Sequence, residues 1–233
     1  MKTLLQLSAD LFPAPFLCPG CSNAEWRGVC KSCLRSIRRN VGLLPPSTSA
    51  IEAFAPILYS FQPAHALLKY WKEHRGHHLE SILFRMDENL RCELQSLNLD
   101  VAIPIPQAFG RSWRRGHESA RATARYFAQE LSLPIVSAVR LQDEPTSKQA
   151  LFDRFERDRA PNPFQVASEA RPWLQSLKPE ARVLIVDDLI TSGNTLIRAA
   201  EALRTERPDL RFWAGSLGYR PRRDRRKNRH PFQ

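Results

Sequence analysis

Two adjacent carboxylates and a group of hydroxyl side chains follow an apolar run near the C-terminus. The run Val183–Val186 is apolar at every position, which is typical of a strand buried on both faces of a sheet. Asp187 and Asp188 come directly after it, and a helix is expected over Thr195–Arg204. Ligands of open α/β sheets bind beyond the carboxyl ends of the strands, so the two acids are well placed to bind one.

The segment between the acids and the helix has the composition of a phosphate-binding loop. Gly193 can adopt backbone conformations closed to other residues, which lets the loop curl around a ligand. Hydroxyl groups and backbone amides at a helix N-terminus bind anions, and the neighbouring acids suit ribose hydroxyls. A sugar phosphate satisfies both halves; an ordinary turn with Thr195 as the helix N-cap is the alternative. The residues predicted to bind phosphate are Thr191, Ser192, Gly193, Asn194 and Thr195.

Four of the five cysteines lie near the N-terminus as two CxxC pairs, Cys18 with Cys21 and Cys30 with Cys33. Each pair supplies two thiolates from a tight turn, and two such turns complete a tetrahedral four-sulfur site. A segment this short has too small a hydrophobic core to fold by itself. A bound metal ion would therefore supply much of its stability. The pattern predicts structural zinc, with a redox pair or an iron–sulfur centre as alternatives.

The chain has 233 residues and a net charge of +11, with a basic block at its C-terminus. From Arg220 onward, seven basic residues stand against Asp224, which is typical of a disordered tail that can attract polyanions or merely aid solubility. No apolar run reaches bilayer length, and the start lacks a cleavage pattern of small residues. A cytoplasmic protein is therefore expected.

The hydrophobic pattern predicts an α/β fold with a mostly parallel sheet flanked by helices. Three regions are expected: residues 1–44 with a first amphipathic helix and the zinc module, 50–219 as the main domain, and 220–233 as the tail. The segment 142–165 is expected to form a long excursion or hood. The expected strands are 53–60, 100–105, 134–139, 182–187 and 211–217, with Pro56 marking the first as an edge strand. The expected helices are 64–74, 79–94, 119–131 and 195–204.

The segment Val183–Thr195 resembles the diphosphoribosyl-binding motif of type I phosphoribosyltransferases. With the other motifs, the chain resembles the ComF family of competence-associated proteins, which have an N-terminal zinc finger. The likeness covers nearly everything except the tail. After Arg115-Gly116, however, the chain has His117-Glu118-Ser119 where the family commonly has an aromatic residue, asparagine and glutamine. The further motifs are Leu67–Tyr70 with Arg75-Gly76, Asp100–Pro106 with Arg111, Arg114, Arg115 and Gly116, the hood residues Thr146, Gln149, Arg157, Asn162 and Phe164, and the four cysteines.

The resemblance implies a type I phosphoribosyltransferase-like fold that binds phosphoribosyl diphosphate or a nucleotide. Asp187 and Asp188 would hold the ribose and stabilise charge, and Mg²⁺ would bridge the diphosphate and the ribose hydroxyls. Arginines pair well with phosphate oxygens, so Arg111, Arg114 and Arg115 would bind the diphosphate; a solvated basic turn is the alternative. Lys69 would reach a phosphate or extend into solvent.

Three functions remain open from the sequence. The first is a ComF-like protein of DNA uptake that binds single-stranded DNA through the zinc module and tail, together with other uptake proteins. The second is an active phosphoribosyltransferase with an unidentified acceptor. The third is a non-catalytic, zinc-stabilised adaptor. The intact acid pair and the loop Thr191–Thr195, called the hydroxyl loop below, argue against a purely non-catalytic adaptor. The basic residues favour contact with a polyanion.

Overall fold

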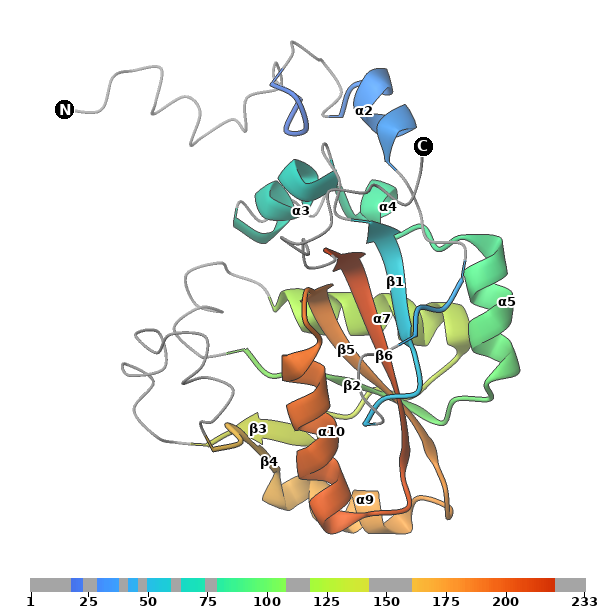
Figure 1. Cartoon of the computed structure of the whole chain (residues 1–233), viewed down its shortest axis with the longest axis vertical. Coiled ribbons are helices and arrows are strands. Elements are labelled where there is room, and N and C mark those ends of the chain that lie inside the picture. The colour runs from blue at the N-terminus through green and yellow to red at the C-terminus, as the bar shows by residue number, and fades with distance from the viewer. Residues whose placement is uncertain are drawn as a thin grey trace, which may run out of the picture.

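The computed structural model describes residues 18–22, 29–37, 42–45, 50–59, 64–73, 79–107, 118–142 and 161–220. Its centre is a four-stranded sheet with the strand order β1-β6-β5-β2, in which every neighbouring pair is parallel. The strands are β1 (Phe54–Tyr59), β2 (Val101–Pro104), β3 (Val139–Leu141), β4 (Phe164–Val166), β5 (Arg182–Ile190) and β6 (Arg211–Tyr219). The helices are α2 (Lys31–Ser36), α3 (Ala64–Glu73), α4 (Glu80–Leu83), α5 (Glu88–Ser96), α7 (Ser119–Leu131), α9 (Arg171–Ser176) and α10 (Asn194–Glu206), with a 3₁₀ turn, η2 (Ser168–Ala170). The predicted α/β class is confirmed (Figure 1).

The order of the strands follows from their composition. β5 and β6 occupy the centre and are buried along most of their length, as strands covered on both faces must be. β1 lies at one edge, where Pro56 interrupts hydrogen bonding on only one side, as predicted. All four strands point the same way, so their carboxyl ends share one edge of the sheet (Figure 1).

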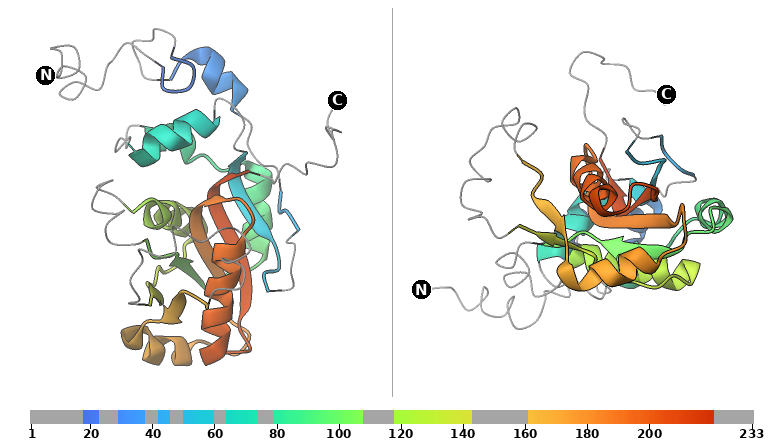
Figure 2. Two further views of the ribbon diagram at one scale, coloured as in Figure 1. Left: turned by 60° about the vertical axis from the view of Figure 1, so that its left-hand side comes forward. Right: turned by 90° about the horizontal axis from the view of Figure 1, so that it is seen from below.

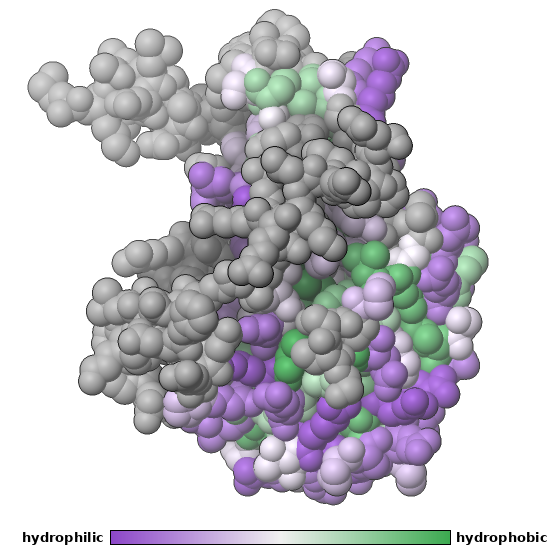
Figure 3. Space-filling model, viewed as in Figure 1, coloured by the Kyte–Doolittle hydropathy of each residue, from purple (hydrophilic) through white to green (hydrophobic). Residues whose placement is uncertain are grey.

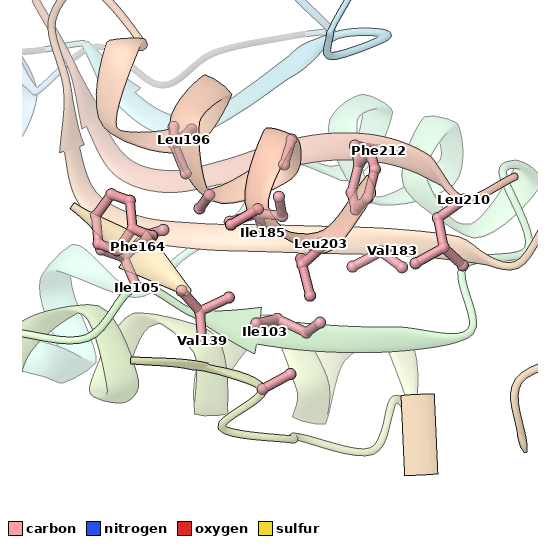
Figure 4. Close-up of a cluster of buried hydrophobic side chains, with 14 of the residues drawn as sticks. Ile103, Ile105, Val139, Phe164, Val183, Ile185, Leu196, Leu203, Leu210 and Phe212 are labelled. Carbon is pink, nitrogen blue, oxygen red and sulfur yellow. The ribbon is translucent and has the colours of Figure 1, made fainter. Parts of the chain in front are cut away.

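Each face of the sheet is covered by its own hydrophobic layer. On one face, α10 packs over β5 and against the two-stranded β3-β4 sheet, and its Leu196 and Leu203 meet Val183 and Ile185 of β5 (Figure 4). On the other face lie α7, α5 and α3. This second layer also contains buried residues of the cysteine region, by which we mean the described residues 18–22 and 29–37. This region lies beside α3 in two views (Figures 1 and 2).

Several predicted boundaries are wrong, and each has a local cause. The helix expected over 79–94 is two helices: α4 ends at Leu83, and Asp87 starts α5 by accepting a hydrogen bond from the amide of Asn89 at 3.0 Å. The strand expected over 134–139 is reduced to a single bridge between Ile135 and Ala102. The strand itself, β3, begins at Val139 and pairs antiparallel with β4. The sequence analysis did not predict α2, β4 or α9.

The most consequential correction concerns β5. The strand was expected to stop at Asp187, but it continues through Asp188 to Ile190. Its partner β6 is also longer than expected, and the two remain paired to Ile190 and Tyr219. The acid pair therefore lies inside a strand rather than in the loop after it, so the two side chains alternate between faces of the sheet.

Several predictions fall outside the described residues. They are the first helix, the basic tail, Arg111, Arg114, Arg115 and the hood residues Thr146, Gln149 and Arg157. The division into regions 1–44, 50–219 and 220–233 stays a prediction. Among the residues described, no helix combines the length and apolar character needed to cross a bilayer.

Candidate ligand site and metal centre

The turn between β5 and α10 is shaped by a glycine in a left-handed conformation. Gly193 has φ of 77° and is the N-cap of α10, and no side chain caps the helix there. Ser192 Oγ lies 3.4 Å from the amide nitrogen of Asn194 and accepts a weak hydrogen bond from it. The alternative in which Thr195 caps the helix is therefore wrong. The N-terminus of a 13-residue helix stands at the carboxyl edge of the sheet, which is an arrangement that favours anions.

The loop presents its polar side chains to solvent and its glycine to the core. Thr191 and Thr195 are exposed, Ser192 and Asn194 are half-buried, and Gly193 is buried. A Cβ at position 193 would lie 2.7 Å from Cζ of Phe54, which is itself buried on β1. The loop thus sits directly on β1, and only glycine satisfies both the backbone angle and this close approach.

The acid pair is divided between the two faces of the sheet. Leu184 and Val186 of β5 pack into the layer of α3 and α7, and Val183 and Ile185 pack into the layer of α10. Strand alternation continues this pattern, so Asp187 lies on the face of α10 and Asp188 on the opposite face. Only Asp187 shares a face with the helix that follows the hydroxyl loop.

Asp188 is enclosed by groups from two helices. Lys72 of α3 approaches both carboxylate oxygens with its Nζ at 2.8 Å. The hydroxyl of Ser119, the first residue of α7, donates a hydrogen bond to Oδ2 of Asp188. Gln107, just beyond β2, donates from Nε2 to Oγ of Ser119 at 2.5 Å. The four side chains form one connected network across β2, α7, β5 and α3.

Asp187 has a different environment. Its Oδ1 accepts a hydrogen bond from the amide of Asp188 at 2.7 Å, and no other described residue donates to its carboxylate. Burial and the negative charge of Asp188 raise the pKa of Asp187 to about 7, against the opposing effects of the Asp188 amide and of Lys72. An acid with this pKa carries a full charge only above neutral pH or beside a hydrogen-bond donor.

This pKa predicts that Asp187 lowers stability at neutral and alkaline pH. Between about pH 4 and 7 the folded chain keeps a proton that the unfolded chain loses, so stability falls as the pH rises through this range. Asp187→Asn is expected to be more stable than the wild type at pH 8 by about 1–2 kcal/mol, discounted for partial exposure. The expected rise in Tm is about 2–8 °C, and it should vanish near pH 4.

The control for this measurement is Asp209→Asn. Arg207 hydrogen-bonds Asp209 and holds its pKa below the usual range, so this carboxylate stabilises the folded chain at neutral pH. Its substitution should lower the Tm at pH 8, with a sign opposite to that of Asp187→Asn. Thermal unfolding followed by circular dichroism from pH 4 to 9 decides the matter; an unchanged pH profile in Asp187→Asn would contradict the prediction.

The four N-terminal cysteines converge as the spacing predicts. Their sulfur atoms all lie within 4.8 Å of one another, and Cys21 Sγ is 3.7 Å from Cys30 Sγ. Four sulfurs placed tetrahedrally about 2.3 Å from a zinc ion would be separated by about 3.8 Å. The cluster therefore has the dimensions of a metal site, and the four cysteines could hold an ion. The remaining thiol, Cys92, is exposed on α5.

The backbone around the cluster already favours thiolates. The amides of Gly20 and Cys30 donate to Cys18 Sγ at 3.4 and 3.3 Å, and the amide of Cys33 donates to Cys30 Sγ at 3.4 Å. Burial opposes ionisation of Cys18, but these amide donors outweigh it and lower its pKa to about 7. Burial and the neighbouring sulfurs raise the pKa of Cys33, so its ionisation calls for a cation in the cluster.

The predicted site residues are only partly brought together. Strand alternation places Asp187 on the face of the sheet that α10 covers, close in sequence to the loop, whereas Lys69 is exposed on α3. The residues that sequence reasoning missed are Lys72, Ser119 and Gln107. No local signal distinguished Lys72 from Lys69, because both lie on the same helix and only the packing of α3 selects between them.

Comparisons with known proteins agree with this arrangement. The model of the phosphoribosyl transferase domain matches residues 114–231, just over half of the chain, and includes the acid pair and the hydroxyl loop. The chain is also 23% identical over 197 residues to competence protein F of Haemophilus influenzae, across 81% of this chain and 84% of that protein. Together these findings confirm the resemblance to the ComF family. The chain belongs to the phosphoribosyl transferase domain family.

Proposed function

We propose that this protein is a competence-associated, phosphoribosyltransferase-like protein that binds phosphoribosyl diphosphate or a nucleotide at Thr191–Thr195. The observation that carries the proposal is the N-terminus of α10 at Gly193, where the N-cap residue has no side chain and the hydroxyl-bearing side chains of Thr191 and Thr195 are exposed. Asp187 lies beside it on the same face of the sheet. The likeness to a competence protein over most of both chains supports the association with DNA uptake.

In this proposal the loop binds the phosphate and the neighbouring acid binds the ribose. Amides at the start of α10 and the hydroxyls of Thr191, Ser192 and Thr195 donate to phosphate oxygens. A magnesium ion bound with the ligand would neutralise part of the diphosphate charge. Arg111, Arg114 and Arg115, which lie outside the described residues, and Lys69 are the proposed diphosphate partners.

Calorimetry with phosphoribosyl diphosphate and Mg²⁺ tests this proposal. Thr195→Val is expected to weaken binding about tenfold, because it removes a charge-assisted hydrogen bond. Thr205→Val, at the other end of α10, changes the same chemical group in an exposed position and should leave the affinity unchanged. No heat with the wild type would overturn the proposal and favour the zinc-stabilised adaptor.

A second assay asks whether bound phosphoribosyl diphosphate is consumed. An active transferase would release pyrophosphate when an acceptor amine or base is supplied, with charge at the reacting carbon stabilised by the site. Pyrophosphate release with a panel of nucleobases, ammonia and amines measures this directly. Binding without release in any reaction would assign the site to ligand sensing rather than transfer.

We also propose contact with single-stranded DNA through the basic N- and C-terminal regions. Lys31 and Arg35 are exposed on α2, and the outer side of this helix forms a hydrophilic surface (Figure 3). Further basic residues of these regions lie outside the described residues. A cationic surface binds the phosphate backbone by releasing counterions, so its affinity falls steeply with salt.

Fluorescence anisotropy with labelled single-stranded DNA at several salt concentrations tests this contact. Truncation after Arg220 and the double variant Lys31→Ala/Arg35→Ala should each reduce the affinity and the salt slope. Arg171→Ala/Lys178→Ala removes the same charge from the region of α9, far from α2 (Figure 1), and serves as the control. An unchanged salt slope in both test variants would contradict the proposed surface.

A further inference from the structure

We propose that Tyr59 and Tyr219 form a stacking site for a nucleobase beside the hydroxyl loop, so that this loop takes a nucleotide that is part of a DNA single strand. The phosphate of that nucleotide lies at the start of α10, and the base of the preceding nucleotide stacks on the tyrosine pair. This inference rests on the proposed function and deepens it, because it names the class of ligand for the same loop. The contact is separate from the basic surface of α2.

The first observation is the position of the two tyrosines at the carboxyl ends of their strands. Tyr59 and Tyr219 are the last residues of β1 and β6, and they are paired in register. Tyr219 is also paired with Ile190, the last residue of β5, which directly precedes the hydroxyl loop. Adjacent strands lie about 4.8 Å apart, so the tyrosines stand one and two strand spacings from the start of the loop.

The tyrosines also lie on the face of the sheet that α10 covers. Tyr219 packs against the hydrophobic layer of α10, which also contains Ile190. The ring of Tyr59 contacts the ring of Tyr219, with centroids 6.3 Å apart, so both rings stand on this face. The loop reaches across the same face to β1, where Gly193 lies against Phe54. The loop and the tyrosine pair are therefore neighbours on one face, at the carboxyl ends of the strands.

The second observation is the geometry of the two rings. They meet edge to face, with an interplanar angle of 74°. In such a contact the partner covers neither face of the ring that presents its edge, and both side chains are half-buried rather than enclosed. Bases of a single strand stack on aromatic side chains placed in this way, whatever the base. Burial and the neighbouring Tyr219 raise the pKa of Tyr59, so its hydroxyl stays protonated beside an anionic strand.

The third observation is the positive charge that follows the tyrosine pair. Arg220, next to Tyr219, is exposed, and its amide donates to the carbonyl oxygen of Ile190 at 2.9 Å. This hydrogen bond fixes the point at which the basic C-terminal block leaves the sheet, beside the hydroxyl loop. A strand that stacks on the tyrosines therefore has a guanidinium group beside it, complementary in charge to its phosphates.

The order of the strands gives the bound DNA its direction. β2 and the acids of β5 lie toward one edge of the sheet, and β6 and β1 with the tyrosines lie toward the other. In the proposed function the sugar of the bound nucleotide lies toward β5. The second ester of its phosphate then points toward β6 and β1, and in a strand that ester carries the preceding nucleotide. Its base is within reach of the tyrosine pair.

Two dinucleotides that differ in one base test the stacking site. The first is a deoxyadenosine–thymidine dinucleotide, and the second has an abasic first residue; both contain the same phosphodiester and the same 3′ thymidine. The ratio of their affinities, measured by calorimetry with Mg²⁺, reports the base contact and cancels the phosphate contact. The wild type should bind the first about tenfold more tightly, and Tyr219→Leu and Tyr59→Leu should each reduce the ratio to below about threefold.

Two further variants separate stacking from packing. Tyr219→Phe keeps the ring and removes only the hydroxyl, so it should keep the wild-type ratio. Trp173→Leu is the matched control, because it also removes a half-buried aromatic ring, on α9 at the opposite end of the sheet (Figure 1), and its ratio should not change. The affinity for thymidine 5′-monophosphate measures the loop by itself and should stay within about threefold of the wild type in every variant.

Equal affinities of the wild type for the two dinucleotides would overturn the stacking site, and so would a wild-type ratio in both Tyr219→Leu and Tyr59→Leu. If thymidine 5′-monophosphate still binds in that case, the proposed function stands without the stacking site. If the wild type binds neither the monophosphate nor the dinucleotides, the proposed function itself fails, and the stacking site fails with it.

Discussion

Replacing Cys18 with serine is expected to abolish stoichiometric zinc binding and to lower the stability of the whole chain. Cys18 is buried, and two backbone amides donate to its sulfur. Serine would remove this acceptor sulfur and would leave only three thiolates to bind the metal ion. The cysteine region shares a hydrophobic layer with Leu67 and Trp71 of α3, so its unfolding would expose that layer. The expected loss is about 3 kcal/mol or more, or about 6–12 °C in Tm.

Cys92→Ser provides the control for this variant. Its thiol is exposed on α5 and lies outside the cluster of four, so the metal content and the Tm should stay at wild-type values. Metal analysis by mass spectrometry and thermal unfolding, with and without a chelator, measure both effects. If the wild type carries iron with sulfide, or no metal at all, the prediction of structural zinc is wrong.

Gly193→Ala is expected to abolish ligand binding and to destabilise the main domain. A residue with a side chain pays about 1–2 kcal/mol at φ of 77°, and its Cβ would lie 2.7 Å from Cζ of the buried Phe54. Relief of the clash would move the loop and the start of α10, so phosphate binding should fall at least about tenfold. The expected total loss of stability is about 2–3 kcal/mol.

Two further variants separate the causes of this effect. Gly42→Ala makes the same change where the new Cβ would meet only the flexible carboxylate of Glu93, 3.0 Å away, so it should have little effect. Gly193→Ala/Phe54→Leu removes the aromatic ring and should relieve the clash without relieving the backbone strain. Calorimetric titration and denaturant unfolding of the three variants test this. Wild-type binding in Gly193→Ala would contradict the role given to the loop.

The parts of the protein that the sequence predicted well are those governed by local patterns. The helix over Ser119–Leu131 was predicted with its observed bounds, because its apolar side chains recur at helical spacing and no proline or glycine interrupts them. Pro56 marked β1 as an edge strand for a reason confined to its own backbone. The cysteine pairs and the glycine before α10 likewise have chemistry that depends on short spacing.

Tertiary structure alone decided where the two acids lie. Whether β5 stops at Asp187 or continues to Ile190 depends on β6 pairing alongside it, and that pairing places the two acids on opposite faces. The partners of Asp188 lie 116 positions away at Lys72 and 69 positions away at Ser119. Hydrophobic periodicity indicates which side of a helix is buried. It does not indicate which charged residue, distant in the sequence, will form an ion pair with that helix. The sequence therefore determined the chemistry available to this protein, and the packing of α3 and α7 decided which carboxylate is paired with a lysine and a serine.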